Sequence, residues 1–464
     1  MLTLKFLGAA QNVTGSRFLI NTGDEKILVD CGLYQERKNL NKNWDPFPVN
    51  PSEISSVFLT HAHLDHSGFL PRLALQGFKG KIFATKPTID IAKIALLDAA
   101  HLFQEDAEKK SKRHQQENRK GPHPEIPLYT PGDVYNIFDR FQEVAYNEKF
   151  SINNSMDVVF HNAGHIIGSS MIEFIDRATG KRLVFSGDLG SGRSPILSGP
   201  EKFENIDYLV LESTYGDRDH KDAESIESLL SETINETYKK NGNILIPSFA
   251  IERTEDILFY LTKLLAENRI PHLLVFLDSP MAINVLATFK EDREFLRGEF
   301  SGSLKDAGSP FDFPLLHLIK TVEESKAINH LKGSAIIIAG SGMCDGGRIK
   351  HHLVTNIIRE DSTILFVGYQ AEGTLGRDIV DGKKEVRIFG EYYPVRAKIV
   401  QIHGFSAHAD QTEIINWLSS VKNIKEIFLV HGEEEAVSAL KEQIEEKLKF
   451  NVEIADYGME REIT

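Results

Sequence analysis

Cysteine is nearly absent from this chain of 464 residues, which contains only Cys31 and Cys344. The two residues are isolated and form no C-x-x-C pair, which indicates a reducing, cytoplasmic setting. Long hydrophobic runs are absent as well, since no apolar stretch approaches the roughly 20 residues needed to span a bilayer. The first residues, 1–6, predict a strand and not a signal peptide. We therefore expect no membrane segment.

Positive charge is the third shortage, because 53 Lys and Arg residues face 67 Asp and Glu residues and the formal net charge is −14. This acidic balance argues against a protein that passively coats nucleic acid. It does not exclude a nuclease, because a local basic groove and bound metal cations can attract phosphate despite an acidic exterior. The remaining composition, with 41% hydrophobic residues, is that of an ordinary globular protein long enough for two domains.

One short stretch, 60–68, carries the strongest chemical signal. It places three histidines and a carboxylate within six residues: His61, His63, Asp65 and His66. The apolar run before it, 57–59, predicts the end of a buried strand. From an extended backbone, the first two histidines can point the same way. Imidazole together with carboxylate favours zinc or a similar divalent ion, and a polar loop that merely contains histidines is the weaker interpretation.

Other predicted strands also end in residues that can bind a metal or transfer a proton. These residues are Asp30, His165, Asp188, Glu212, His408 and His431. Each alone could be a capping carboxylate or a buried histidine with an ordinary hydrogen bond. Because so many strands deliver histidine or carboxylate at one end, we expect those ends to converge on one site.

Between Glu212 and His403 the pattern changes to helices that alternate with short strands, which predicts an α/β domain with a parallel sheet. The strands are expected at 243–247, 273–277, 335–339 and 363–367. We predict a domain inserted at 214–396 into a first domain made of 1–213 and 397–464, which resumes with the strand before His403. Two glycine-rich turns of the insert, 340–348 and 368–377, can offer backbone N–H groups to phosphate. Neither matches the P-loop or the dinucleotide fingerprint, so an ordinary turn is the alternative.

At these residues the sequence resembles the metallo-β-lactamase superfamily. In particular it is similar to the β-CASP RNA-processing nucleases, relatives of the polyadenylation-factor endonuclease and of ribonuclease J. The superfamily resemblance is carried by Asp30, the H-x-H-x-D-H box, His165 and Asp188. The β-CASP branch is marked by Glu212 in Glu-Ser-Thr-Tyr-Gly, His408 in Phe-Ser-Ala-His-Ala-Asp, and His431. The resemblance implies a metallo-β-lactamase αβ/βα sandwich with an inserted α/β β-CASP domain.

The resemblance also implies roles for these residues. One zinc ion would be held by His61, His63 and His165, a second by Asp65, His66 and His431, and both by the bridging Asp188. Asp30 would orient a ligand histidine. His408 would protonate the leaving oxygen, and Glu212 would orient it and raise its pKa. Phosphate contacts are expected from Ser406, Ser341 and Gly342, and from Arg377, whose guanidinium can pair with phosphate bidentately.

Taken together, these expectations describe an enzyme with two Zn2+ ions that cleaves single-stranded RNA between its two domains, leaving a 5′-phosphate and a 3′-hydroxyl. Endonucleolytic and 5′-to-3′ exonucleolytic cleavage both fit, and so does a homodimer. A hydrolase of a small thioester, ester or lactam is one alternative, which the large insert argues against. A non-catalytic RNA-processing scaffold is another, which the intact ligand set argues against. A DNA-repair nuclease is a third alternative. In that branch an apolar residue typically occupies the position of His431, so the histidine argues against it.

Overall fold

The computed structural model describes residues 2–119, 121, 123–220, 226–298, 311, 313–331 and 333–464. The chain divides into two compact units, which are treated separately below. The first consists of 1–192, 198–219 and 408–464, and the second of 193–197 and 220–407. Among the described residues, no helix combines the length and the apolar character needed to cross a membrane.

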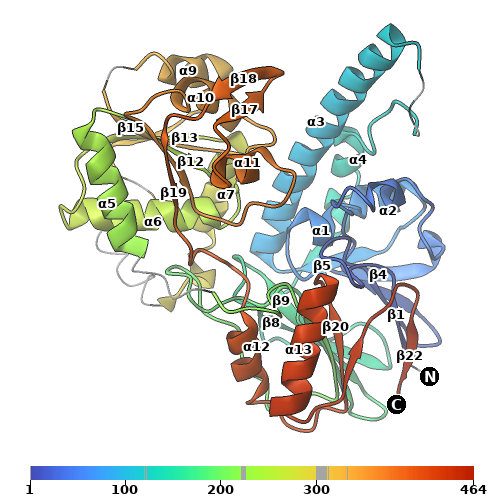
Figure 1. The fold of residues 1–464 in the computed structure, drawn as a ribbon. Helices are drawn as coiled ribbons and strands as arrows, with labels where there is room; N and C mark the ends of the chain where they lie inside the picture. The colour runs from blue at the N-terminus through green and yellow to red at the C-terminus, as the bar shows by residue number, and fades with distance from the viewer. Residues whose placement is uncertain are drawn as a thin grey trace. The chain divides into compact units, whose positions relative to one another are not determined.

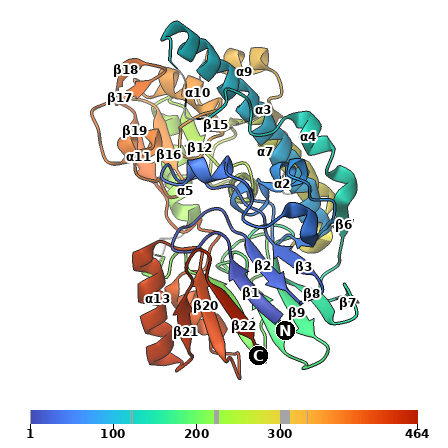
Figure 2. The ribbon, with the colours of Figure 1, turned by 90° about the vertical axis from the view of Figure 1, so that its right-hand side faces the viewer.

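The first unit contains two seven-stranded sheets (Figures 1 and 2). The first sheet runs, in spatial order, β22 (Glu460–Ile463), β1 (Leu2–Phe6), β2 (Phe18–Asn21), β3 (Lys26–Val29), β4 (Ile54–Phe58), β5 (Lys81–Ala84) and β6 (Phe141–Glu143). The second runs β21 (Val452–Ile454), β20 (Glu426–Val430), β11 (Tyr208–Glu212), β10 (Arg182–Phe185), β9 (Ser170–Asp176), β8 (Met156–Asn162) and β7 (Phe150–Ser151).

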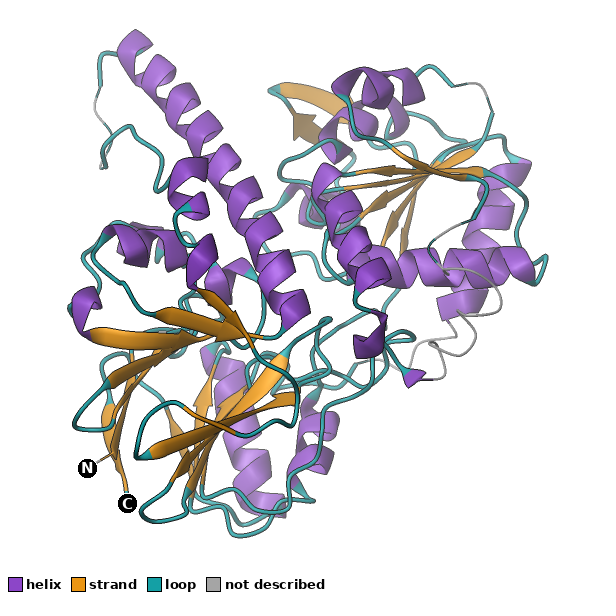
Figure 3. Ribbon diagram, turned by 180° about the vertical axis from the view of Figure 1, so that it is seen from behind, coloured by secondary structure: helices purple, strands orange, loops and turns teal. Residues whose placement is uncertain are grey.

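The two sheets pack face to face through an apolar core to which both contribute. Phenylalanines dominate it: Phe6, Phe18, Phe58, Phe160, Phe174, Phe185 and Phe428. Helices cover the outer faces, so that the layers run helix, sheet, sheet, helix (Figure 3). The helices beside the first sheet are α1 (Leu64–Ser67), α2 (Leu70–Leu75), α3 (Lys86–Gln116) and α4 (Pro131–Tyr135), and those against the second are α12 (Gln411–Leu418) and α13 (Glu434–Lys447). Covered on both faces, β11 is buried along its whole length. The predicted αβ/βα sandwich is therefore confirmed.

The second unit is built on a six-stranded sheet in which every neighbouring pair is parallel. Its order is β14 (Leu316–Leu318), β13 (Leu274–Asp278), β15 (Ala335–Ala339), β12 (Ile244–Pro247), β16 (Thr363–Phe366) and β19 (Lys398–Gln401). Its helices are α5 (Ile226–Lys239), α6 (Arg253–Ala266), α7 (Pro280–Glu291), α9 (Val322–Ile328), α10 (Ile349–Asn356) and α11 (Leu375–Val380), and β17 (Glu385–Ile388) forms a hairpin with β18 (Glu391–Pro394). Of the short 3-10 helices, η4 (Arg293–Phe295) lies in this unit. The first unit contains η1 (Leu40–Asn43), η2 (Pro51–Glu53) and η3 (Phe138–Arg140). The predicted parallel α/β domain is confirmed, with its four expected strands within one residue of their bounds.

One strand differs from its expected place. The strand before His403 was predicted to begin the return to the first domain, but β19 pairs in parallel with β16 of the second unit. A strand as short as Lys-Ile-Val-Gln fits either sheet, because strand pairing depends on partners far away in the sequence. The structure thus corrects the placement of this strand. The bounds of the inserted domain, 214 and 396, stay a prediction.

Candidate metal centre

The candidate site in the first unit lies just past the ends of strands that run in the same direction. β3, β4 and β5 are mutually parallel in one sheet, and β10, β11 and β20 are mutually parallel in the other. The residues carried past these ends are Asp30 after β3, the histidine box after β4, Asp188 after β10, Glu212 at the last position of β11 and His431 after β20. His165 follows β8. The parallel alignment explains why residues from six strands reach one place.

Close backbone approach holds the histidine box against the loop after β3. The backbone N–H of Cys31 donates to the carbonyl of His66 at 2.7 Å. A Cβ atom on Gly32 would lie 1.6 Å from the carbonyl oxygen of Asp65, so only glycine fits there. Beneath this contact, the buried guanidinium of Arg17 donates from Nε and Nη2 to the carbonyl of Gly32, at 3.0 and 2.7 Å. No local pattern in the sequence predicts a role for Arg17.

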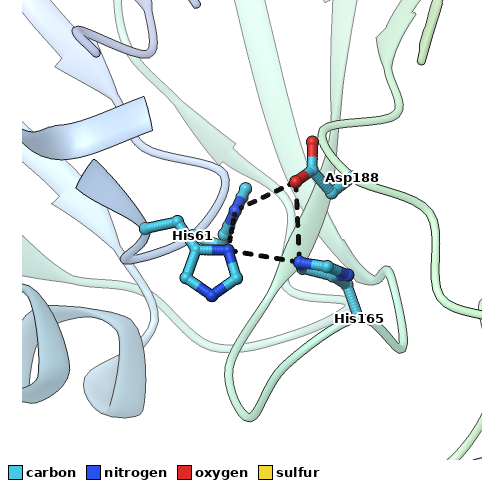
Figure 4. Close-up of side chains that lie close together, drawn as sticks. His61, His165 and Asp188 are labelled. Atoms are coloured by element: carbon cyan, nitrogen blue, oxygen red, sulfur yellow. Dashed lines mark hydrogen bonds and ion pairs between the residues drawn. The ribbon is translucent and has the colours of Figure 1, made fainter. Parts of the chain in front are cut away.

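Four donor atoms form the first group: Nε2 of His61, Nδ1 of His63, Nε2 of His165 and Oδ2 of Asp188 (Figure 4). Nδ1 of His63 lies 3.1 Å from Nε2 of His61 and 3.3 Å from Nε2 of His165. The Asp188 oxygen lies 3.4 Å from His61 and 3.5 Å from His165. Ligands placed 2.0–2.1 Å from a tetrahedral zinc ion would be about 3.4 Å apart. The spacing of this group therefore fits a zinc ion.

The second group consists of Asp65, His66 and His431, with the other carboxylate oxygen of Asp188 beside it. Oδ1 of Asp188 lies 3.1 Å from Nε2 of His66 and 3.6 Å from Nε2 of His431. Oδ2 of Asp65 lies 3.5 Å from the same His431 nitrogen. Each oxygen of Asp188 thus faces one group, an arrangement that fits the predicted sharing of this carboxylate between two ions.

Unsatisfied buried atoms support this fit. Oδ1 of Asp188 and Nε2 of His431 are buried and make no hydrogen bond, although polar groups surround them. Burial, reinforced by the neighbouring His66, lowers the pKa of His61 to about 3, and burial also lowers the pKa values of His63 and His165. These three imidazoles are therefore neutral and keep a lone pair for a metal ion.

Asp30 and Thr60 fix one ligand histidine from behind. Oδ2 of Asp30 lies 2.7 Å from Nδ1 of His66, and its two oxygens also accept from the backbone N–H and the hydroxyl of Thr60, each at 2.8 Å. When Nδ1–H of His66 donates to Asp30, Nε2 is the ring nitrogen that faces the second group and can bind a metal ion. Thr214 does the same for His431, since its hydroxyl lies 3.0 Å from Nδ1. Neither threonine was predicted from the sequence, although Thr60 directly precedes the histidine box.

We predict that Asp30→Asn weakens metal binding at the second group by about 10- to 100-fold, the usual cost of losing a partner of a ligand histidine. The amide keeps the size of the side chain but removes the negative charge that holds the His66 proton. Isothermal titration of the metal-stripped variant measures this change. Asp24→Asn, which alters an exposed carboxylate between β2 and β3, is the matched control. Unchanged affinity in Asp30→Asn would contradict the orienting role.

His408 lies beside both groups but has a different partner. Its ring centre is 4.5 Å from that of His165, and its Nδ1 lies 3.0 Å from Oε1 of the fully buried Glu212. Burial opposes protonation of His408, but the carboxylate of Glu212 outweighs it and raises the pKa of His408 to about 9. Glu212 also accepts backbone N–H groups, from Leu189 on Oε1 at 2.7 Å and from Thr214 on Oε2 at 3.1 Å. Because its oxygens already serve these donors, Glu212 is better placed to hold His408 than to bind a metal.

The residues expected to contact phosphate all belong to the second unit: Ser406, Ser341, Gly342 and Arg377. Ser341 follows β15, and its hydroxyl accepts from the backbone N–H of Gly346 at 3.3 Å. Arg377 lies in α11, where its Nε donates to Asp381 at 2.8 Å. Their roles, like those of the metal-site residues, stay predictions.

Three known protein domains match successive parts of the chain. Residues 19–206 match the metallo-β-lactamase superfamily domain, 254–379 match the β-CASP domain, and 392–455 match the Zn-dependent metallo-hydrolase RNA specificity domain. The last range contains both His408 and His431.

Similar curated proteins span most of the chain. Ribonuclease TTHA0252 of Thermus thermophilus is 35% identical, over 93% of this chain and 94% of its own length. An RNase J-like protein of Methanocaldococcus jannaschii is 30% identical, over 93% of each chain. Transcription termination factor FttA of Methanosarcina mazei is 29% identical, over 96% of this chain and 69% of its own.

A crystal structure of a protein of unknown function from Enterococcus faecalis V583 shares the fold, with a TM-score of 0.57, 13% identity and 99% of each chain covered. The domain matches and the similar curated proteins confirm the resemblance found in the sequence and the prediction of a metal-dependent hydrolase. The chain belongs to the β-CASP ribonuclease family of the metallo-β-lactamase superfamily.

Proposed function

We propose that this protein is a zinc-dependent ribonuclease that cleaves single-stranded RNA and leaves a 5′-phosphate and a 3′-hydroxyl. The observation that carries the proposal is the position of His408. It is a histidine with a raised pKa, held by a buried glutamate, beside a carboxylate that joins two groups of metal-binding atoms. RNA as substrate is supported by the RNA specificity domain matched at 392–455 and by the similarity to ribonuclease TTHA0252.

Two zinc ions per chain fit the two groups of donor atoms. His61, His63 and His165 would hold one ion, and Asp65, His66 and His431 the other, with Asp188 shared between them. When bound, such ions withdraw charge from a phosphodiester and promote the deprotonation of water. Because the carboxylate of Asp188 directs one oxygen to each group, it fits a pair of ions better than a single ion.

The protein side chains would supply orientation and a proton. Glu212 holds Nδ1–H of His408, so the second ring nitrogen, Nε2, carries the proton that passes to the leaving ribose oxygen. After this transfer the imidazole is neutral and still donates Nδ1–H to Glu212. Asp30 and Thr214 keep His66 and His431 in the tautomers that face the site.

Burial of the site favours a flexible strand. The side chains of His61, His165 and Asp188 are at most 2% exposed. A single strand can bend to bring a phosphate to such atoms, whereas a duplex is stiff and would have to unpair. We therefore expect RNA annealed to its complement to be cut poorly.

The proposal is tested with end-labelled and internally labelled RNA of several unstructured sequences, incubated with the metal-loaded protein. We expect cleavage, products with 5′-phosphate and 3′-hydroxyl ends, and little turnover of thioesters or β-lactams. The sizes of the labelled products separate endonucleolytic from 5′-to-3′ exonucleolytic cutting. Turnover of a small thioester without RNA cleavage would replace this proposal with a small-substrate hydrolase.

A further prediction concerns the number of ions. The purified protein should contain two zinc ions per chain, and His431→Ala should contain about one, because only the second group loses a ligand. Plasma mass spectrometry of the dialysed proteins measures both values. One ion in both proteins, or two in both, would contradict the assignment of His431. A homodimer and a cytoplasmic location stay predictions, the first of which light scattering can test.

A further inference from the structure

The second unit has an unusual surface where the central strands of its parallel sheet end. In the order of the strands, β12 lies between β15 and β16. Two residues past the end of β12 comes Phe249, whose side chain is 40% exposed. The neighbouring strands end in glycines at the same edge, with Gly342 after β15 and Gly368 after β16. In open parallel sheets, this carboxyl edge is where ligands bind.

Because Gly342 and Gly368 have no side chains, their backbone lies next to the ring of Phe249. A Cβ atom on Gly342 would lie 2.7 Å from Cδ2 of Phe249, closer than such contacts allow, and one on Gly368 would lie 3.7 Å from Cε2. Backbone therefore packs directly against the ring, while a large part of the ring stays open to solvent. Elsewhere in this unit the phenylalanines of the sheet, such as Phe276 and Phe366, are buried.

A buried side chain fixes this arrangement. Gln370 is 3% exposed, and its Nε2 donates to the carbonyl of Gly342 at 3.1 Å and to the carbonyl of Gly368 at 3.3 Å. One amide thus ties together the two strand ends that border Phe249. Tyr369, between Gly368 and Gln370, adds a second aromatic side chain that is 54% exposed. An exposed aromatic ring held in place by its neighbours suits a flat ligand that can lie against its face.

We propose that Phe249 binds RNA by stacking against one nucleobase of the strand. The inference rests on the proposed RNA substrate and adds a binding residue in the second unit, outside the predicted phosphate contacts. Every base offers an aromatic face, so this contact supplies affinity with little sequence preference. A ring held in place before binding loses little conformational freedom, which favours the contact.

The test measures the affinity for a fluorescent, unstructured RNA by anisotropy, with full-length metal-loaded protein in a His408→Ala background so that the RNA stays intact. Phe249→Ala should weaken binding by roughly 5- to 150-fold, the range found when one base loses its aromatic partner. Phe249→Trp should restore binding, and its indole fluorescence should be quenched when RNA is added. Tyr238→Ala and Tyr238→Trp are the matched controls, because Tyr238 is 46% exposed in α5, which leads into the opposite end of β12.

The outcomes separate this inference from the proposed function. If the parent protein binds RNA and Phe249→Ala binds it equally well, the stacking role is wrong while the ribonuclease proposal stands. If the parent protein neither binds nor cleaves RNA, both are wrong. If Phe249→Ala leaves RNA affinity unchanged and shifts the mass measured by light scattering, the surface joins copies of the chain and the proposal is overturned.

Discussion

We expect His408→Ala to slow RNA cleavage by about 10²- to 10⁴-fold, the usual cost of losing a general acid. Metal content should stay that of the parent protein, because His408 belongs to neither group of metal-binding atoms. Its ring is held by the buried carboxylate of Glu212. Single-turnover cleavage of labelled RNA measures the rate, and plasma mass spectrometry measures the metal. His403→Ala is the matched control, since His403 is exposed and lies five residues earlier in the chain.

Loss of one metal ion from His408→Ala would show that His408 and His431 have exchanged roles. A rate equal to that of the parent protein would show that another group protonates the leaving oxygen. Glu212→Gln separates a chemical from a structural role for this pair. It keeps the shape of the side chain but removes the charge that raises the pKa of His408, so the rate should become sensitive to mildly alkaline pH while metal content is kept.

We expect an effect at least as large from Asp188→Asn, because one carboxylate faces both groups of donor atoms. The amide removes a negative charge that lies among six other predicted ligands, so both ions should bind more weakly. The loss of cleavage should equal or exceed the roughly 10²- to 10⁴-fold loss expected for the general acid, since the chemistry that both metals supply is impaired. Zinc titration and single-turnover cleavage measure the two effects.

Asp176→Asn provides the control for this change. Asp176 ends β9 at the end remote from the site, and its carboxylate accepts hydrogen bonds within the turn that follows. The amide oxygen can accept from Ala178 and the amide NH2 can donate to the hydroxyl of Thr179, so metal content and cleavage should both be unchanged. If Asp188→Asn lost only one ion and kept the other at full affinity, Asp188 would not bridge the two groups.

Much of the candidate site could be predicted because most of its residues lie at the end of a predicted strand or a few residues beyond it. The run at 57–59 ends just before His61, and β11 ends on Glu212 itself. A local apolar run predicts a buried strand, and a polar residue that follows it is expected at the edge of the sheet. The grouping of the ligands came from the family resemblance, since nothing local states that His165 faces His61.

What the sequence did not predict depends on contacts between distant segments. No local pattern singles out Arg17, because its role depends on a hydrogen bond to the carbonyl of Gly32, which only the fold brings near. β22 was missed because its residues, Glu-Arg-Glu-Ile, are mostly charged, yet the strand pairs with β1 at the sheet edge. The ion pair between Arg377 and Asp381, four residues apart at the end of α11, was not predicted either. It makes the predicted phosphate contact of Arg377 compete with a partner already present.

The most direct measurement of the central claim is a zinc titration of the metal-stripped protein that follows bound zinc and cleavage of a single-stranded RNA together. Two groups of ligands joined by Asp188 predict that bound zinc saturates at two ions per chain and that cleavage reaches its plateau at the same ratio. The same RNA annealed to its complement should be cut far more slowly throughout the titration. Full RNA cleavage before any zinc is added, or a plateau of both signals at one ion per chain, would contradict the account.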